Sequence, residues 1–465
     1  MALRFYNTMS RTFEEFRPLE DEHVRMYTCG PTVYAPSHVG NFRAYIFEDI
    51  LRRYLKYRGY GVTQVMNLTD IDDKTIRDSQ AAGISLDEHT RKFKDMFFED
   101  LDRLNIERAE LYPEAAKHIP EMVALVQKLI DKGHAYSSGS SIYFKISSFP
   151  RYGALSHMQI DELKAGARVD SDEYEKETAS DFVLWKGWNE RDGSIFWETP
   201  IGKGRPGWHI ECSAMSMKYL GEHFDIHTGG VDNIFPHHEN EIAQSEGATG
   251  HKFVNYWLHN AHLIVEGQKM AKSEGNFFTI EDIVRKGHNP IAIRYLLMSV
   301  HYRQQLNFTF DALEASKAAV TRLRDFRSNV ESARSGLDSQ AVKDSIKEAE
   351  EGFQAALDDD LNISPCLGFV FDFVREINSI TAEQGLSDHD KEAVLETLRK
   401  FDTVLGVIFV SKEGVDERIE QMINERTNAK RARDFKRADR IRADLLAEGI
   451  VLEDTPGGTK WKRKI

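Results

Sequence analysis

The sequence predicts an α/β protein whose parallel-sheet domain is interrupted by an insertion and followed by a helical bundle and a small basic C-terminal region. Three observations carry this prediction. The chain opens with strand, loop, helix and strand. Short aromatic-rich runs and an acidic linker replace the helical pattern over residues 133–204, and helical spacing dominates from about residue 310. A strand–helix–strand order is typical of a parallel sheet, and 465 residues exceed what one hydrophobic core usually organises.

The opening unit can be placed residue by residue. Residues 24–28 (VRMYT) are apolar enough for a buried strand, and Cys29-Gly30-Pro31 breaks that strand. Residues 41–57 predict a helix, and residues 61–68 (GVTQVMNL) a second strand. We therefore expect a βαβ unit at the start of the sheet domain.

Helical sequence continues to about residue 132, after which short aromatic runs (SSIYFKI, FVLWKGW) and an acidic linker predict an insertion. Strand and helix patterns resume with residues 224–227 and 236–244. We expect the sheet domain to occupy residues 1–132 and 205–309, on either side of an insertion at residues 133–204.

The C-terminal third is predicted to be mainly helical. Val394, Leu398, Phe401 and Leu405 repeat at spacings of four, three and four before a glycine, which indicates one buried helix face. We expect a helical bundle over 310–408. The region 409–465 should hold a break, a charged helix over 416–446 and a turn-rich tail.

Composition restricts the class of protein. Three cysteines cannot form a disulfide framework, the N-terminus lacks the apolar stretch of a secretion signal, and no apolar run is long enough to span a membrane. These features predict a cytoplasmic protein in a reducing compartment. The net charge of −14 disfavours nucleic acid at first sight, but residues 424–465 hold 12 Lys and Arg against 7 Asp and Glu.

Four scattered residues have side chains suited to zinc: Cys29, Cys212, His237 and Glu241. If a helix opens near Pro236, the last two share one face. A lone cysteine is more often a small core residue, and a His and Glu pair on a helix can simply be solvated. Polar side chains are dense over residues 237–241, between apolar neighbours. Burying them is costly, which favours a buried functional site. Cys366 lies in an apolar helical stretch and is interpreted as core.

Two segments are suited to phosphate. Residues 36–41 (PSHVGN) precede a helix, where backbone donors favour an anion, Gly40 permits close approach, and His38 and Asn41 can donate hydrogen bonds. Lys269 and Lys272 of KMAKS can follow charge on a leaving pyrophosphate. Taken alone, a His-x-Gly turn is common, and a solvated charge run would explain the lysines.

The C-terminal region has features of an RNA-binding surface. Residues 426–442 contain eight Lys or Arg, and Trp461 stands beside Lys460 and a final basic run. A single-stranded base can stack on an indole while cations meet its phosphates. The alternative is a solvated helix with a stray aromatic residue.

These residues resemble one family nearly end to end. HVGN at 38–41 and KMAKS at 269–273 resemble the HIGH and KMSKS motifs of class I aminoacyl-tRNA synthetases, whose catalytic domain is Rossmann-like. The segments MYTCGPTVY, NLTDIDDK, GRPGWHIECSAM, DIHTGGVDNIFPHHENEIAQSE and LEDTPGGTKW resemble the cysteinyl-tRNA synthetases specifically.

The resemblance implies an enzyme that activates L-cysteine with ATP and Mg²⁺ and transfers it to tRNA(Cys), acting as a monomer. It implies one Zn²⁺ that is bound by the four residues above and that selects the cysteine thiolate. The residues it implies for ATP are His38, Gly40, Asn41, Gly230, Asp232, Lys269 and Lys272, of which His38, Asn41 and the lysines are catalytic. It implies Thr69, Trp208 and His227 for the amino acid, and we expect Arg433, Lys436, Arg440 and Trp461 to contact tRNA.

Two departures and two rival functions accompany this interpretation. Asn41 replaces the second histidine of HIGH, and Ala271 replaces the first serine of KMSKS, but neither change removes a lysine. One rival is a ligase of the same catalytic fold that joins cysteine to an amino sugar, and it lacks the terminal region. The other is an inactive RNA-binding paralogue, which retention of the motif residues disfavours.

Overall fold

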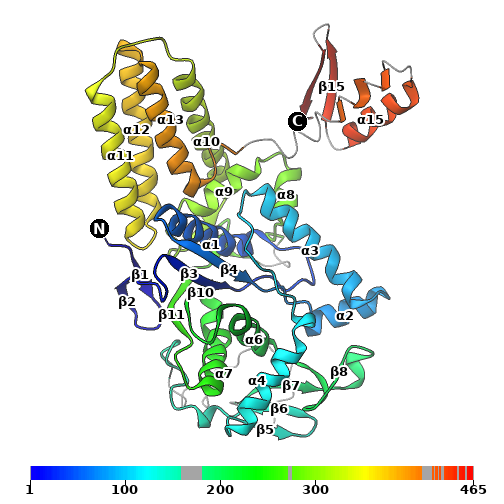
Figure 1. The fold of residues 1–465 in the computed structure, drawn as a ribbon. Helices are drawn as coiled ribbons and strands as arrows, with labels where there is room; N and C mark the ends of the chain where they lie inside the picture. Colours follow the sequence, from blue (N-terminus) through cyan, green and yellow to red (C-terminus); the bar gives the residue numbers. More distant parts are fainter. Residues whose placement is uncertain are drawn as a thin grey trace. The chain divides into compact units, whose positions relative to one another are not determined.

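The computed structural model divides into two compact units, residues 1–408 and 409–465 (Figure 1). The residues described are 2–158, 181–270, 275–410, 422–423, 425–427, 429–430, 434–447, 450–455 and 458–463. No helix among them is both long and apolar enough to cross a membrane. The internal boundaries predicted at 132, 204 and 309 stay predictions.

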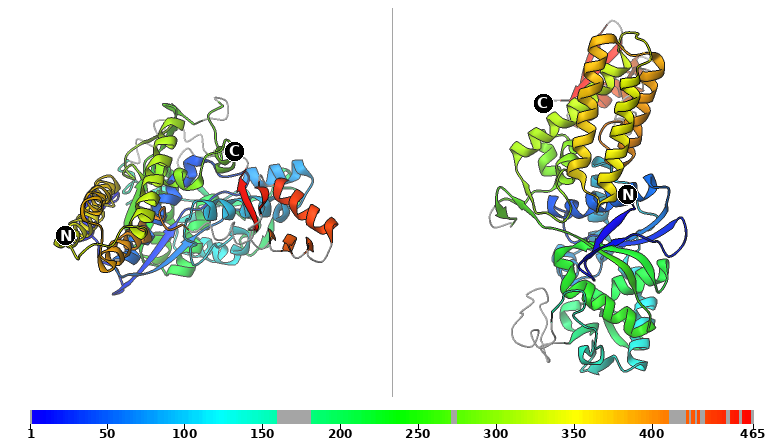
Figure 2. Two further views of the ribbon diagram at one scale, coloured as in Figure 1. Left: turned by 90° about the horizontal axis from the view of Figure 1, so that it is seen from above. Right: turned by 90° about the vertical axis from the view of Figure 1, so that its left-hand side faces the viewer.

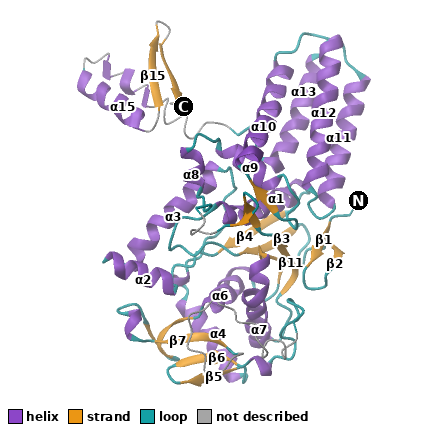
Figure 3. Ribbon diagram, turned by 180° about the vertical axis from the view of Figure 1, so that it is seen from behind, coloured by secondary structure: helices purple, strands orange, loops and turns teal. Residues whose placement is uncertain are grey.

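A four-stranded parallel sheet forms the centre of the first unit. Its strands, in spatial order, are β11 (Val254–Asn260), β10 (Phe224–Gly230), β3 (His23–Thr28) and β4 (Gly61–Met66). Helix α1 (Val39–Tyr57) packs on one face of this sheet, and α6 (Trp208–Leu220) and α7 (Glu239–Thr249) lie on the other side (Figures 1 and 3). The predicted α/β class and the opening βαβ unit are confirmed.

The central strands are buried mainly toward their carboxyl ends. In β3, Val24, Met26, Tyr27 and Thr28 are fully buried, whereas His23 and Arg25 are partly exposed. Helices on both sides of a parallel sheet exclude water from both of its faces. The carboxyl ends of β3 and β10 therefore meet in a closed interior, where polar side chains need partners.

One buried carboxylate on α1 gives a pH-dependent prediction. Glu48 is 1% exposed, and its Oε1 accepts a hydrogen bond from Thr228 Oγ1 at 2.8 Å. Burial raises the pKa of Glu48 from about 4.5 to about 8. The folded state then holds this proton more tightly than the unfolded chain, so stability is lost as pH rises from about 4.5 through 8.

Glu48→Gln should remove this pH dependence, because the amide cannot ionise. The two proteins should have similar thermal midpoints at about pH 4.5, whereas at pH 8.5 the variant should be the more stable by several kcal/mol, on the order of 4. Scanning calorimetry at a series of pH values measures the difference. Parallel midpoint curves for the two proteins would show that Glu48 ionises normally.

Before the insertion the chain forms α2 (Asp73–Ala82), α3 (Leu86–Arg103) and α4 (Ile119–Asp131). The insertion is an antiparallel sheet of short strands. In spatial order they are β5 (Ala135–Ser138), β6 (Ser141–Phe144), β7 (Phe182–Gly187), β9 (Gly202–Pro206) and β8 (Trp197–Thr199). Its aromatic residues pack inward, as with Phe144 stacked on Phe182 at 5.0 Å between ring centres.

After β11 come β12 (Leu263–Val265), β13 (Gln268–Lys269), α8 (Ile280–Arg285), α9 (Pro290–Met298) and β14 (Leu306–Phe308). Four long helices follow and form the bundle visible in Figure 2. They are α10 (Phe310–Glu331), α11 (Gln340–Asp358), α12 (Ile363–Gln384) and α13 (Asp388–Leu405). The predicted face of α13 is buried, and Gly406 ends this helix in a left-handed conformation.

Asp360, in the turn between α11 and α12, ties the bundle to the sheet domain. It is 1% exposed and has a left-handed backbone (φ +58°). Its Oδ1 accepts hydrogen bonds from Tyr6 N at 2.9 Å and Tyr302 OH at 2.6 Å, and its Oδ2 lies 2.7 Å from Arg303 Nε. Tyr6 belongs to β1 (Arg4–Asn7), which pairs with β2 (Thr12–Glu15).

Asp360→Asn should destabilise the first unit by about 2–4 kcal/mol, because a buried ionic contact is lost and an amide is left facing the guanidinium of Arg303. Asparagine tolerates the left-handed backbone, so the loss of stability measures the lost side-chain contacts rather than backbone strain. Asp359→Asn is the control. Asp359 pairs with Arg4 at 2.8 Å on the surface, and its loss should cost less than about 1 kcal/mol. Thermal unfolding distinguishes the two variants, and equal midpoints would contradict this role.

The second unit contains α15 (Phe435–Ala447) and a hairpin of β15 (Ile450–Thr455) and β16 (Gly458–Arg463). Two predictions were wrong here. The tail is a hairpin rather than a turn-rich segment, because residues 450–455 and 458–463 pair across one turn. The predicted helix over 416–446 is interrupted at Asp434, whose Oδ1 accepts a hydrogen bond from Arg437 N and so caps α15.

Candidate metal and nucleotide site

Four side chains from three separate segments converge beneath the carboxyl end of the central sheet. Cys29 follows β3, Cys212 lies in α6, His237 lies in the short π-helical turn Ile234–His238 that precedes α7, and Glu241 lies in the first turn of α7. Their candidate ligand atoms all lie within 4.8 Å of one another. The four residues that the sequence suggested as zinc ligands are thus brought together in one cluster.

Contacts within the cluster orient the imidazole of His237. Its Nε2 lies 3.1 Å from Glu241 Oε1, and its Nδ1 lies 2.8 Å from His209 Nδ1. The indole of Trp208 stacks on the ring at 4.3 Å between centres. His237 therefore presents Nε2 to the other candidate ligands while its second nitrogen is held by a neighbour.

Burial disfavours the charged forms of the side chains in this cluster. A hydrogen bond with Cys212, and then burial, raise the pKa of Cys29, burial raises that of Glu241, and burial lowers the pKa of His237. The buried Tyr27 hydroxyl finds no nitrogen or oxygen partner among the described residues. A dication would reverse these tendencies by favouring thiolates and carboxylate, so the donor set fits a metal.

The donor types point to zinc. Two thiolates, one imidazole and one carboxylate are ligands that tetrahedral zinc accepts, with edges of about 3.3–3.8 Å between ligand atoms. A second set shares Cys29 and Glu241 but completes the cluster with His227 and His238, also within 4.8 Å. The first set has two thiols against one, which suits zinc better.

The three residues expected at the amino acid lie around this cluster. Trp208 stacks on His237, and His227 Nε2 lies 3.0 Å from Glu241 Oε2. Thr69 is buried beside the segment after Cys29, since Thr69 N donates to Pro31 O at 3.1 Å. Trp208 and His227 therefore contact cluster residues directly, whereas Thr69 lies beside the segment that follows Cys29.

His38 begins α1 as its N-cap residue. Asn41 N donates to His38 Nδ1 at 3.2 Å, and His38 N donates to Asn41 Oδ1 at 3.1 Å. Asn41, which stands where the HIGH motif has histidine, thus completes a reciprocal cap. Gly40 packs closely against Met270, because a Cβ at residue 40 would lie 3.0 Å from Met270 Cε.

Met270 of KMAKS and the segment that follows the motif lie close to this helix start. Val39 N donates to Phe278 O at 2.9 Å, and His38 pairs with Thr279 in an isolated bridge. Lys269 is exposed at the end of β13, whereas Lys272 and Ala271 lie outside the described residues. The described parts of the two phosphate-binding candidates are therefore neighbours.

Gly230 and Asp232 lie at the carboxyl end of β10, where the chain turns into a short helix. A Cβ on Gly230 would lie 2.3 Å from Asp232 Oδ1, so a larger residue there would displace the Asp232 side chain. Asp232 is exposed. Both residues thus border the same sheet edge as Cys29.

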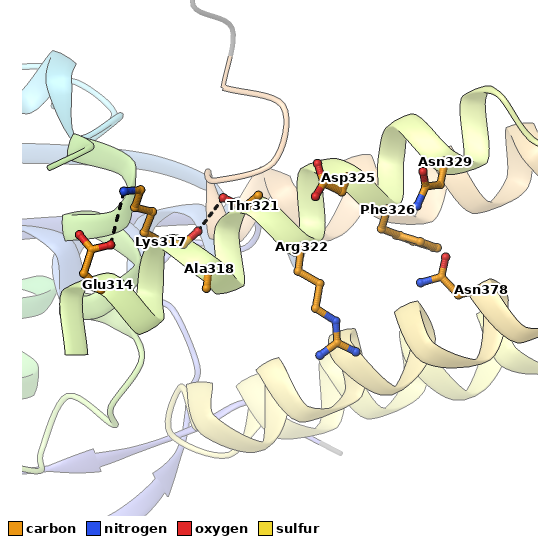
Figure 4. A pocket seen from close by; sticks show the side chains of 9 residues that line it. All are labelled: Glu314, Lys317, Ala318, Thr321, Arg322, Asp325, Phe326, Asn329 and Asn378. Carbon is orange, nitrogen blue, oxygen red and sulfur yellow. Dashed lines mark hydrogen bonds and ion pairs between the residues drawn. The ribbon is translucent and has the colours of Figure 1, made fainter. Parts of the chain in front are cut away.

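Of the four residues expected at tRNA, Arg440 is exposed on α15. Lys436 lies in α15 and Trp461 in β16, with side chains outside the described set, and Arg433 also lies outside it. An open groove of about 420 Å³ between α10 and α12 contains none of the predicted residues. Its lining mixes acids and bases, with Lys317 paired to Glu314 and Arg322 extending toward α12 (Figure 4).

The structure adds residues that the sequence interpretation missed: Tyr27, His209, His238 and His259. His238 directly follows the predicted ligand His237, and His209 lies three residues before Cys212, so their proximity in the sequence was available as a signal. His259 is carried by β11, and nothing in its local sequence (YWLHN) relates it to the cluster. Only folding places it there.

Comparisons with known proteins agree with this geometry. Residues 15–318 match the family model of the tRNA synthetases class I (C) catalytic domain, and residues 352–410 match the DALR domain. The cysteine–tRNA ligase of Protochlamydia amoebophila is 50% identical, over 100% of this chain and 98% of its own length. That of Brachyspira hyodysenteriae is 49% identical over 99% of each chain.

Solved structures support the fold. The methionyl-tRNA synthetase of Mycobacterium tuberculosis, in complex with methionyl-adenylate, aligns with a TM-score of 0.59 at 16% identity, over 83% of this chain and 90% of its own. A putative arginyl-tRNA synthetase from Campylobacter jejuni aligns at 0.55 and 12% identity, over 84% and 94%. With half of all positions identical to full-length relatives, the chain belongs to the cysteine–tRNA ligase family of class I aminoacyl-tRNA synthetases.

Proposed function

We propose that this chain activates L-cysteine with ATP and transfers it to the 3′ end of tRNA(Cys). The cysteine carboxylate attacks the α-phosphate, which forms cysteinyl-adenylate and expels pyrophosphate. A hydroxyl of the terminal ribose then attacks the acyl carbon and releases AMP. The observation that carries the proposal is the convergence of two thiols, an imidazole and a carboxylate beside Trp208 and His227.

Cys29, Cys212, His237 and Glu241 would hold one Zn²⁺. When bound, the ion would supply a preference for a soft thiolate over a hydroxyl, which an apolar pocket provides poorly. Around it, Trp208 stacks against His237 and closes one side, and Thr69 would accept a hydrogen bond from the substrate ammonium group. Selection against serine would thus occur at the first binding step.

Adenylation would rely on positioning and charge rather than on a general base. His38 and Asn41 would contact phosphate oxygens at the start of α1, and Gly40 would let the triphosphate approach the backbone. Lys269 and Lys272 would stabilise charge on the departing pyrophosphate, with Mg²⁺ accompanying ATP. Gly230 and Asp232 would contact the nucleoside at the edge of β10.

The second unit would bind the tRNA. Arg433, Lys436 and Arg440 would meet phosphates, and Trp461 would stack on a base. Full-length identity with cysteine–tRNA ligases supports tRNA over an amino-sugar acceptor. The monomeric state and the cytoplasmic location stay predictions.

Two assays on the full-length protein test this function. Cysteine-dependent exchange of pyrophosphate into ATP should be measurable, and removal of zinc by a chelator should abolish it while ATP still binds. Charging of tRNA(Cys) with cysteine should follow. Exchange without charging would favour the amino-sugar ligase, and absence of exchange would favour the inactive paralogue. A chelated enzyme that still prefers cysteine over serine would refute the role of zinc.

A further inference from the structure

A line of hydrogen-bonded side chains leads from Cys29 to the N-terminal strand. Cys29 Sγ lies 3.3 Å from His238 Nε2, and His238 Nδ1 lies 2.8 Å from His259 Nε2. His259 Nδ1 in turn lies 2.8 Å from Thr8 Oγ1. The line therefore consists of one thiol, two imidazoles and one hydroxyl, each within hydrogen-bonding distance of the next.

The surroundings hold both rings in place. His238 is 0% exposed and His259 4% exposed. The His238 ring lies against Gly229, where a Cβ would come within 2.7 Å of its Cε1, and 5.2 Å from the ring of Trp257. Thr8 N donates to Trp257 O at 2.9 Å, which fixes Thr8 beside β11. Neither ring can turn away without repacking the sheet edge.

Each neutral imidazole donates from one nitrogen and accepts at the other, so the line can run in only two directions. In one direction the thiol donates to His238 and the hydroxyl accepts from His259. In the other, Thr8 donates to His259, His259 to His238, and His238 Nε2–H to the sulfur. A thiolate has no proton to donate, so a Cys29 thiolate selects the second direction.

We propose that Thr8, His259 and His238 are positioning residues that direct one N–H donor at the Cys29 thiolate when zinc is bound. The inference rests on the proposed zinc site. Two thiolates and one carboxylate carry three negative charges, so together with the dication they would give the site a net charge of −1 even before the substrate thiolate adds another. A donor on a ligand sulfur offsets part of that charge and allows a further thiolate to bind.

The same geometry favours this role over direct ligation by His238. Both of its nitrogens face partners, Cys29 on one side and His259 on the other, and its Nε2 lies farther from Glu241 Oε1 (4.0 Å) than from the sulfur. If His238 bound zinc, its Nε2 would have to present a lone pair, rather than a proton, to the cluster. His238 would then donate to His259, which is the opposite direction of hydrogen bonding along the line.

The test compares His238→Gln with His238→Asn in the full-length protein. The glutamine amide reaches the position of Nε2 and keeps a donor at the sulfur, whereas the asparagine amide reaches only the position of Nδ1. Zinc affinity, measured by chelator competition, should stay within about threefold for Gln and fall about 10–100-fold for Asn. In the Co²⁺-substituted protein, the thiolate-to-metal charge-transfer band should move to longer wavelength for Asn only.

Thr8→Val and Thr8→Ser extend the test to the far end of the line, at a half-buried residue. Valine should weaken zinc binding about fivefold, the change expected from one hydrogen bond, and serine should not. His223→Gln serves as a control, because His223 Nε2 contacts Asn255 and no member of the line.

The outcomes separate this inference from the proposed function. Wild-type protein that binds no zinc would refute the proposed site. Wild-type protein with one zinc, together with equal affinity and equal spectra for the Gln and Asn variants, would refute the positioning role. Loss of zinc in both variants would make His238 a ligand and would also overturn it.

Discussion

Cys212→Ser is expected to reduce cysteine-dependent pyrophosphate exchange by on the order of 10³-fold or more and to lower zinc content from one ion per chain to nearly none. Serine replaces a sulfur with an oxygen that zinc binds far more weakly. Cys212 is 0% exposed, and serine is smaller than cysteine, so the packing of α6 should survive. Metal analysis and exchange kinetics measure the two effects.

Cys366→Ser is the matched control. Cys366 is also 0% exposed and lies in α12, within the bundle and apart from the cluster. A serine there buries the same hydroxyl without touching the proposed zinc site, so zinc content and exchange should stay at wild-type values. Equal loss of both zinc and exchange in the two variants would contradict a specific ligand role for Cys212.

His38→Asn should lower exchange by about 10²–10³-fold with little change in stability. Asparagine is among the best N-cap residues, and its amide oxygen can replace Nδ1 as acceptor for Asn41 N. The variant therefore keeps the cap of α1 but loses the outer ring nitrogen that would contact phosphate. Exchange kinetics at saturating cysteine, together with a thermal midpoint, test both statements.

His38→Ala provides the contrast, because it removes the cap as well as the ring. It should lose about 1 kcal/mol of stability in addition to the same fall in exchange. Should His38→Asn retain wild-type exchange, His38 would be a capping residue only. The reciprocal contact with Asn41 would then explain its place in the sequence.

The elements most clearly predicted were those with a strong local pattern. The βαβ opening follows from an apolar run broken by Cys29-Gly30-Pro31, a helical pattern over 41–57 and a second apolar run from Gly61. The buried face of α13 follows from its spacing. The C-terminal tail was predicted less well. Alternation in residues 450–463 is short, and the capping role of Asp434 depends on which backbone amide its side chain meets.

Sequence order alone was sufficient for the fold class and for the residue types of the metal cluster, because both depend on local patterns and on chemistry intrinsic to each side chain. It could not relate Cys29 to His238, His259 and Thr8, which lie on four separate segments and meet only when β3, β10 and β11 pair. Hydrogen-bond direction and burial are properties of that packing. Tertiary structure therefore decides which histidine faces the sulfur and which neighbour orients it.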